Sequence, residues 1–309
     1  MDDLVALRQE RAARYMASHS RSNGASDHEM RSRSRSPRRS VRPILEVESD
    51  LRVLSWNIDG LDSEREPEDL IGRTLWVVKT INETRPHVVL LQELIDFNLN
   101  LLSRVLGKAF HIYTQEDPSL PYFVGILVHK ATVDVIGRPM TISFPTTKMG
   151  RSALSVRVKL KSKPESVVEC ITAHLESLRE SANERKKQLS VMQTHIDEVL
   201  ESRVIQRVLF AGDLNIRDNE VPEKFKSNDC WVQAGRDKDS EYTWDLQRND
   251  NSSMPNGGKP RCRFDRMYCF SPSTVSFTAD SFQLVGTERV QGLDRFPSDH
   301  FGILASFKL

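Results

Sequence analysis

The chain has 309 residues, 38% of them hydrophobic, which is enough to bury the core of one large domain or two ordinary ones. The formal net charge of +1 is unevenly distributed, because residues 1–42 hold 10 Arg against 5 Asp or Glu and the remainder holds 34 basic against 38 acidic residues. The four cysteines form no zinc-binding or disulfide pattern, and no stretch approaches a membrane span or secretory signal, so we expect an intracellular protein without a membrane anchor.

The first segment is a basic tail. RSRSRSPRRS at residues 31–40 is low in apolar side chains and dense in like charge, which predicts a disordered tail over 1–46 ahead of a folded domain over 47–309. Residues 4–16 have loosely helical apolar spacing. The Arg-Ser run is either a solvated linker or a segment for nuclear import, phosphorylation or RNA or DNA contacts. Its regularity favours the second interpretation and a nuclear protein, with the cytoplasm as the alternative.

The body alternates strand and helix patterns. Residues 52–58 read as a strand, and Ile71, Leu75, Val78 and Ile81 recur at helical spacing before Pro86. Residues 87–94 form an apolar run typical of a strand covered on both faces, and a helix follows that ends at Gly107. Strand patterns dominate residues 121–175, then a long helix and three closing strands complete the chain. This order predicts one α/β domain with mixed or antiparallel sheets.

Polar residues recur where predicted strands end. They are Asn57 in WNIDGL, Glu93 in LLQEL, Asp213 and Asn215 in FAGDLN, and Asp299 with His300 in FPSDHFG. Each alone has a structural explanation, such as a turn, a salt bridge or a satisfied buried histidine. Together, carboxylate and amide oxygens without thiolates suit a hard ion, which predicts a Mg²⁺ site with Mn²⁺ as an alternative. Side chains at i and i+2 of an extended segment point the same way, so Asp213 and Asn215 are expected to face one pocket, with Arg217 on the same side.

Five ordered motifs carry a family resemblance: WNIDGLD, LLQEL, HLES, GDLN and SDHFG. They resemble the signatures of the endonuclease/exonuclease/phosphatase superfamily over roughly residues 50–309. FPTTKMGRS (144–152), EYTWD (241–245) and RFDRMY (263–268) are similar to the 5′-tyrosyl-DNA phosphodiesterase branch. The resemblance implies a four-layer α/β/β/α sandwich, with two packed, mixed and largely antiparallel sheets and the site at the strand ends of one edge.

The resemblance also implies roles for individual residues. Glu93 is expected to be the principal Mg²⁺ ligand, with Asn57 and Asp213 in the metal site. Asp213, helped by Asn215, is expected to position and deprotonate the attacking water. His300, oriented by Asp265, is expected to donate to a phosphate oxygen, and His174 to make a second phosphate contact.

Substrate contacts are implied at five further positions. Arg217 stacked on the Trp244 indole would face the phosphate. Tyr122 and Phe264 match positions that line the channel for the DNA end, where an aromatic ring stacks on a terminal base, and Ser177 of HLES is a further contact. For Trp244 a core role, and for Tyr122 and Phe264 an ordinary place in a strand, are the alternatives.

The function implied is Mg²⁺-dependent hydrolysis of the phosphotyrosyl bond between a protein tyrosine and a DNA 5′ end, leaving a 5′-phosphate, in repair of trapped type II topoisomerase. The net charge of −4 beyond residue 42 argues against extensive duplex binding and favours a short single-stranded end as partner. The alternatives are an abasic-site endonuclease or another phosphatase of the superfamily, and a nuclear RNA-processing interaction protein. Residues 1–45 are too short and polar for the ubiquitin-binding domain that many branch members carry, so ubiquitin-linked recruitment is not expected.

Overall fold

The structure is a computed structural model, and it describes residues 50–62, 68–115 and 120–309. The predicted disordered tail (1–46), the helical spacing at 4–16 and the predicted start of the domain at residue 47 lie outside the described residues, so these three stay predictions.

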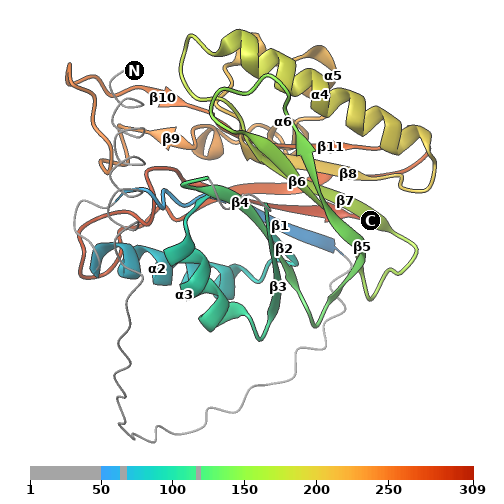
Figure 1. Cartoon of the computed structure of the whole chain (residues 1–309), viewed down its shortest axis with the longest axis horizontal. Helices are drawn as coiled ribbons and strands as arrows, with labels where there is room; N and C mark the ends of the chain where they lie inside the picture. The colour runs from blue at the N-terminus through green and yellow to red at the C-terminus, as the bar shows by residue number, and fades with distance from the viewer. Residues whose placement is uncertain (1–49, 63–67, 116–119) are drawn as a thin grey trace, which may run out of the picture.

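Two large sheets form the middle of the molecule (Figure 1). The six-stranded sheet has the order β12-β13-β1-β2-β4-β3 and the five-stranded sheet the order β11-β8-β7-β6-β5. Neighbours are antiparallel except for the parallel pairs β1–β2 and β7–β8. The strands of the first sheet are β1 (Asp50–Asn57), β2 (Val88–Leu94), β3 (Phe110–Thr114), β4 (Phe123–His129), β12 (Ala279–Val285) and β13 (Gly302–Lys308). Those of the second are β5 (Val133–Ser143), β6 (Ser152–Leu160), β7 (Val167–His174), β8 (Val208–Asp213) and β11 (Asp265–Phe270), and a short ribbon pairs β9 (Trp244–Asp245) with β10 (Arg261–Cys262).

Helices cover the outer face of each sheet (Figure 1). The helices are α2 (Glu68–Thr84), α3 (Asp96–Leu106), α4 (Ala182–Glu201), α5 (Glu223–Lys226) and α6 (Cys230–Gln233), with the 3₁₀ turns η1 (Asp218–Glu220) and η2 (Lys238–Ser240). α2 and α3 pack on the first sheet, and α4 with α5 packs on the second. The predicted four-layer α/β/β/α sandwich is therefore confirmed.

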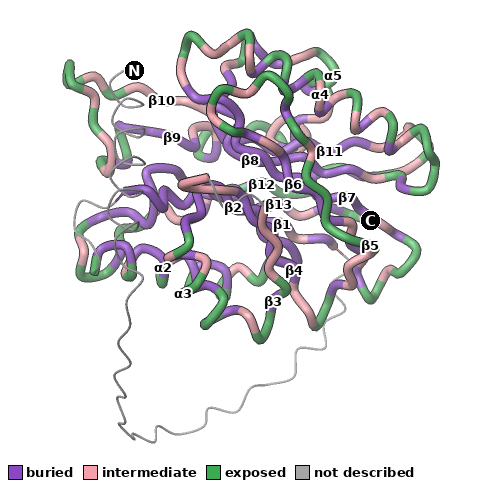
Figure 2. The backbone as a smooth tube through the Cα atoms, viewed as in Figure 1, coloured by how far each residue is buried: buried purple, intermediate pink, exposed green. Residues whose placement is uncertain are grey.

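Successive side chains along a strand point to opposite faces of its sheet, and this alternation builds three core layers. The residues of the central strands are coloured as buried in Figure 2. In β1, Val53 enters the layer between the sheets while Leu54 and Trp56 enter the layer under α2 and α3. In β8, Leu209 faces the layer between the sheets and Phe210 faces α4 and α5. Because both faces of these central strands are covered, their polar residues concentrate at the strand ends.

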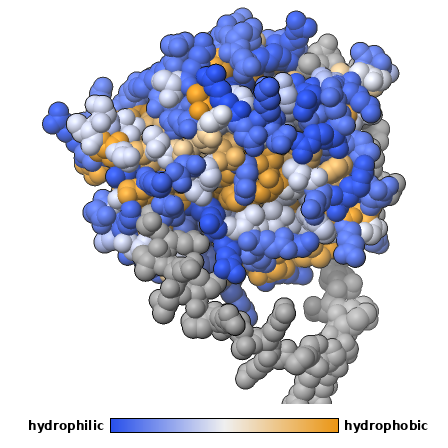
Figure 3. Space-filling model, turned by 180° about the vertical axis from the view of Figure 1, so that it is seen from behind, coloured by the Kyte–Doolittle hydropathy of each residue, from blue (hydrophilic) through white to orange (hydrophobic). Residues whose placement is uncertain are grey.

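The face seen in Figure 3 is mainly hydrophilic, with hydrophobic side chains gathered near its middle. Among the described residues, no helix has the length and apolar character needed to cross a bilayer.

The helix predicted before Pro86 is confirmed, but its buried face differs from the predicted stripe. Ile71 and Leu75 are 37% and 43% exposed, whereas Arg73 is buried. The Arg73 guanidinium donates to the carbonyl oxygens of Asp59 (3.2 Å) and Asp62 (2.6 Å). The inner face of α2 is partly polar because it holds the loop that follows β1.

Candidate active site

Polar strand ends from both sheets meet at one edge of the sandwich. β1 ends at Asn57, β7 at His174 and β8 at Asp213, and Glu93 is the penultimate residue of β2. In the second sheet Asp213 pairs in register with His174 on one side and with Asp265, the first residue of β11, on the other. The convergence follows from the two parallel pairs, because parallel strands end at the same edge of a sheet.

Asn57 joins the two sheets through its side chain. Its Nδ2 donates to Glu93 Oε1 at 3.0 Å and to Asp213 Oδ2 at 2.9 Å, and its Oδ1 accepts from the Asp59 N–H at 3.0 Å. One buried amide therefore fixes two buried carboxylates against each other. Asn57 presents N–H groups to these carboxylates, so in this arrangement it positions the acidic pair and its oxygen faces the backbone of Asp59.

The backbone at Glu93 is strained. Its φ is +54°, in the left-handed region that non-glycine residues rarely occupy, and the β2–β4 register shifts between Leu91 and Leu94. Such a conformation costs roughly 1–3 kcal/mol and persists only where its surroundings impose it. The bulge turns the Glu93 side chain toward Asn57 and away from the regular strand alternation.

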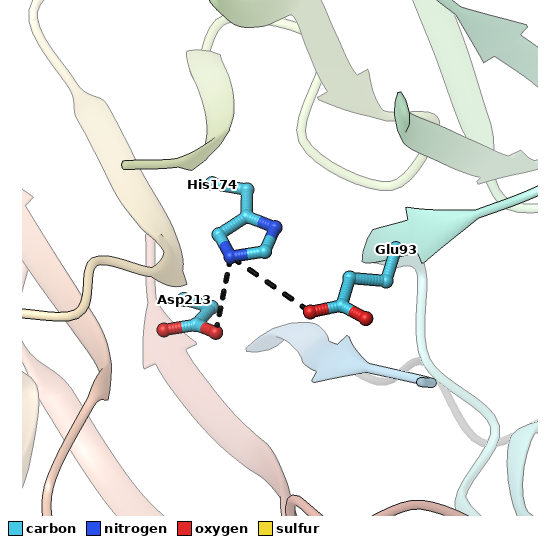
Figure 4. Close-up of side chains that lie close together, drawn as sticks. All are labelled: Glu93, His174 and Asp213. Carbon is cyan, nitrogen blue, oxygen red and sulfur yellow. Dashed lines mark ion pairs between the residues drawn. The ribbon is translucent and has the colours of Figure 1, made fainter. Parts of the chain in front are cut away.

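His174 points its Nε2 at both carboxylates, as Figure 4 shows. Nε2 lies 3.4 Å from Asp213 Oδ2 and 3.9 Å from Glu93 Oε1. On the opposite side of the ring, Nδ1 lies 3.2 Å from Nη1 of Arg151. These groups are 3% exposed or less, apart from Arg151 at 7%.

His300 forms a second buried pair with Asp265, whose Oδ2 lies 2.7 Å from His300 Nδ1. His300 Nε2 lies 3.7 Å from Asp213 Oδ2 and has no hydrogen-bond partner among the described residues. Burial by itself lowers the pKa of His300, but the carboxylates of Asp265, Asp299 and Asp213 outweigh it and raise the pKa to about 10. In this arrangement His300 is an imidazolium at neutral pH, with Nε2–H directed at the acidic cluster.

Asn215 departs from the predicted geometry. β8 ends at Asp213 and Asn215 has φ +52°, so the segment is not extended, and the i, i+2 alternation on which the prediction rested does not apply. Asn215 Nδ2 donates to the carbonyl oxygen of Leu175 at 3.3 Å, while its backbone N–H donates to Asp213 Oδ1 at 3.1 Å. Asn215 thus orients the Asp213 carboxylate through its backbone.

Arg217 lies beside Phe264, which packs on Trp244. Its guanidinium lies 6.0 Å from the centroid of the Phe264 ring, and its Nη1 lies 3.5 Å from Glu220 Oε1. Trp244 packs on Phe264 with the ring centroids 5.7 Å apart, and its Nε1 donates to Asp299 Oδ2 at 3.3 Å. Both aromatic side chains are buried in a small cluster beside the acidic groups.

Tyr122 and Ser177 lie close to His174 and Arg151. The Tyr122 and His174 rings are 5.9 Å apart, and Ser177 Oγ accepts from Arg151 Nη2 at 3.3 Å. Tyr122, Arg151 and His174 line a small pocket. Arg151 lies in the FPTTKMGRS stretch but was not predicted as a site residue, because this loop has no periodicity that indicates where its side chains point.

The donor set suits a hard divalent cation. Two groups have ligand atoms within 4.8 Å of one another: Glu93, His174 and Asp213, and Asp213, Asp265 and His300. Four buried carboxylates, those of Glu93, Asp213, Asp265 and Asp299, concentrate negative charge in a small volume, which a cation would offset. Their oxygen atoms match the preference of Mg²⁺ and not that of a soft metal.

Comparisons with known proteins identify the family. The chain is 35% identical to tyrosyl-DNA phosphodiesterase 2 of Danio rerio over 268 residues, which cover 85% of this chain and 68% of that protein. It is 36% identical to tyrosyl-DNA phosphodiesterase 2 of Rattus norvegicus over 271 residues, covering 86% and 69%. The chain belongs to the tyrosyl-DNA phosphodiesterase 2 family.

Solved structures agree with this assignment to the tyrosyl-DNA phosphodiesterase 2 family. The crystal structure of the Danio rerio protein complexed with a single-strand DNA product has a TM-score of 0.75 and 34% identity, and it covers 85% of this chain and 100% of that chain. No model of a protein family matches the chain. The chain is accordingly a hydrolase that acts on phosphodiester bonds, on the fold that the sequence motifs implied.

Proposed function

We propose that the chain is a Mg²⁺-dependent 5′-tyrosyl-DNA phosphodiesterase that frees the DNA 5′ end from a protein tyrosine and leaves a 5′-phosphate, with a trapped type II topoisomerase as its target. The names of the relatives support the bond that is cleaved. The single-strand DNA product in the Danio rerio structure supports a short single-stranded end as partner. The observation that carries the proposal is the Glu93–Asp213 pair bridged by Asn57, with two buried histidines directed at it.

The residues of the site divide into two tasks. Glu93 and Asp213 would hold Mg²⁺, with Mn²⁺ as a substitute, and the ion would offset charge on the phosphate oxygens. Asn57 keeps the two carboxylates at a fixed separation through its Nδ2. The histidines face the same volume and can contact the anionic substrate.

Asp213 accepts a proton from the attacking water, and His300 donates a hydrogen bond to the phosphate. Asp213 positions the attacking water and takes its proton, with Oδ1 held by the backbone N–H of Asn215. His300 donates from Nε2 to a non-bridging phosphate oxygen, and Asp265 keeps the ring oriented through Nδ1. His174 donates to a phosphate oxygen from the other side of Asp213.

A tyrosine leaving group suits a site with these side chains. A tyrosine phenol has a reference pKa of about 10 and departs more readily than a sugar alkoxide, so a strong general acid is less necessary. Arg217, Trp244 and Phe264 on one side, and Tyr122 with Ser177 on the other, would flank the phosphate and the terminal base.

The test compares three oligonucleotides that carry a 5′-phosphotyrosine, a 3′-phosphotyrosine or an internal abasic site, each with Mg²⁺ or EDTA. We expect cleavage of the first only, with a 5′-phosphate product, and no turnover in EDTA. Equal cleavage of the abasic duplex would favour the endonuclease alternative, and turnover in EDTA would remove the metal from the mechanism.

For the basic tail we propose nuclear import, or contacts with nucleic acid, through the Arg-Ser run at residues 31–40. Five arginines within this run support the proposal, since such clusters bind import receptors and phosphates. Fluorescence microscopy of the full chain tests it, with Gln in place of Arg31, Arg33, Arg35, Arg38 and Arg39. Unchanged nuclear accumulation of this variant would exclude import through the run.

A further inference from the structure

Two nitrogens of one imidazole have different neighbours at the site. His174 Nε2 faces Asp213 and Glu93, whereas Nδ1 faces the guanidinium of Arg151, 3.2 Å from Nη1 (Figure 4 shows the ring and the two carboxylates). Which nitrogen carries the proton decides whether His174 presents an N–H or a lone pair to the acidic pair.

The chemistry of arginine decides this question. A guanidinium carries only donor groups and stays protonated in proteins, so in this contact Nη1 donates and Nδ1 of His174 must accept. An imidazole that accepts at Nδ1 carries its proton on Nε2.

We propose that Arg151 is a positioning residue that holds His174 as the Nε2–H tautomer, which makes His174 a hydrogen-bond donor to a phosphate oxygen and not a metal ligand. The inference rests on the function proposed above and deepens it. Metal coordination by an imidazole requires the lone pair of the coordinating nitrogen, and Nε2–H has none. The group Glu93, His174 and Asp213 is thereby divided, with the two carboxylates left for the cation.

The Arg151 side chain is itself fixed on several sides. Its Nη2 donates to Ser177 Oγ at 3.3 Å, and its guanidinium lies 4.8 Å from the centroid of the Tyr122 ring. The Arg151 side chain and His174 are both buried, which strengthens a charge-assisted hydrogen bond relative to one in water.

A buried carboxylate holds the loop that carries Arg151. Glu176 Oε1 accepts from Thr147 Oγ1 at 2.7 Å and from the backbone N–H groups of Lys148 (2.6 Å) and Met149 (3.0 Å). Thr147 Oγ1 in turn accepts from the backbone N–H of Arg151 at 2.8 Å. Glu176 lies two residues after His174 in the sequence, and the Thr147 hydroxyl links it directly to the backbone of Arg151.

The decisive measurement is the tautomer of His174 by long-range ¹H–¹⁵N NMR of the full chain labelled at histidine nitrogens, with His174→Asn to assign the signals. We expect Nε2–H in the wild type, both without metal and with saturating Mg²⁺. The Nδ1–H tautomer, or a Mg²⁺-induced ¹⁵N shift typical of coordination at Nε2, would overturn the proposal. This result does not depend on cleavage of any substrate, so it is separate from the test of the proposed function.

Variants of Arg151 test its role. In Arg151→Met we expect mixed tautomers at His174 and a fall of roughly 10- to 100-fold in kcat with a smaller change in KM, the range for one lost charge-assisted hydrogen bond. Arg151→Lys keeps a donor and is expected to restore part of both. An unchanged Nε2–H population in a folded Arg151→Met would overturn the proposal.

A matched pair of threonines tests the link from Glu176 without changing a buried charge. Thr147→Val keeps the shape of the side chain but removes the hydroxyl between Glu176 and Arg151, and we expect it to shift the His174 tautomer toward a mixture. The neighbouring Thr146 donates to Glu184 Oε1 on the exposed surface, so Thr146→Val serves as the control and is expected to leave the NMR signals of His174 unchanged. Equal effects of the two substitutions would contradict the link.

Discussion

Glu169 and His174, two of the buried polar residues of strand β7, lie in contrasting surroundings. Near its start, Glu169 accepts from Ser155 Oγ (2.8 Å) and Arg157 Nε (2.8 Å), and its Oε1 lies 2.7 Å from His195 Nε2. At its end, the Nε2 of His174 stays 3.4 Å or more from the carboxylate oxygens of Asp213 and Glu93. The contacts of Glu169 are thus shorter than those between His174 Nε2 and the two carboxylates.

The backbone conformation also differs between the two clusters. Glu169 lies within a regular strand, whereas Asp59, Glu93 and Asn215 around the acidic pair have φ of +48°, +54° and +52°. Backbone strain around the acidic pair, against regular strand around Glu169, is the difference expected between a functional cluster and a structural one. The comparison predicts that equivalent substitutions affect activity at one cluster and stability at the other.

The largest expected effect is on activity at the strand-end cluster. Asp213→Asn and Glu93→Gln are expected to lower cleavage of a 5′-phosphotyrosyl oligonucleotide by on the order of 10²- to 10³-fold or more, because each removes a charge needed by the cation or the water. Their thermal stability should be equal to or above that of the wild type, since like charges are removed. Loss of activity only in parallel with unfolding would contradict this assignment.

Glu169→Gln is the complementary test. The variant keeps the shape of the side chain but weakens three hydrogen bonds to a charged group, and we expect the free energy of unfolding to fall by about 1–3 kcal/mol. Activity per folded molecule is expected to stay at the wild-type level. Urea unfolding followed by circular dichroism, beside an activity assay on the same sample, measures both.

The loss of folding stability at acid pH should depend on Glu169. Burial alone raises its pKa, but the hydrogen bonds from His195, Arg157 and Ser155 outweigh it and hold the pKa below the ordinary value of 4.5. A carboxyl group with a lowered pKa stabilises the fold above its unfolded pKa, and this stabilisation is lost as the pH falls through the folded pKa. The stability difference between the wild type and Glu169→Gln should therefore shrink below about pH 4.5, whereas a difference that widens in acid would contradict the lowered pKa.

Much of this site was predictable from where strands end. Asn57, Glu93 and Asp213 each lie at the end of an apolar run, and His300 comes just before one. Strands covered on both faces favour apolar residues along their length, so polar residues at their ends are informative. The direction of individual side chains was less predictable. The chain leaves the extended conformation after Asp213, so the strand alternation does not reach Asn215, and this backbone geometry has no signature in the residue types.

Two other features depended on tertiary contacts. Ile71 and Leu75 are exposed because the inner face of α2 includes Arg73, which binds the loop after β1. Arg151 lies in a loop. The Glu176 carboxylate, which comes from a different part of the sequence, holds this loop and so fixes the contact between Arg151 and His174. Periodicity identifies a helix or strand but not the partner that turns one face polar.

The smallest expected effect concerns the strain at Glu93. Glycine adopts positive φ without the cost paid by other residues, so Glu93→Gly is expected to be more stable than Glu93→Ala by about 1 kcal/mol, with both inactive. Denaturant midpoints of the two variants give this difference. At Glu169, in regular strand, the same pair of substitutions should show the opposite order.

The claim that the strand-end cluster binds the cation is tested most directly by titration with Mn²⁺ as a substitute for Mg²⁺. Electron paramagnetic resonance measures the free Mn²⁺ at each step of the titration. The account predicts that the wild type and Glu169→Gln bind Mn²⁺ alike, that Mg²⁺ competes, and that Glu93→Gln weakens binding strongly. Wild-type affinity in Glu93→Gln, or its loss in Glu169→Gln, would contradict the assignment of the strand-end cluster as the site of the cation.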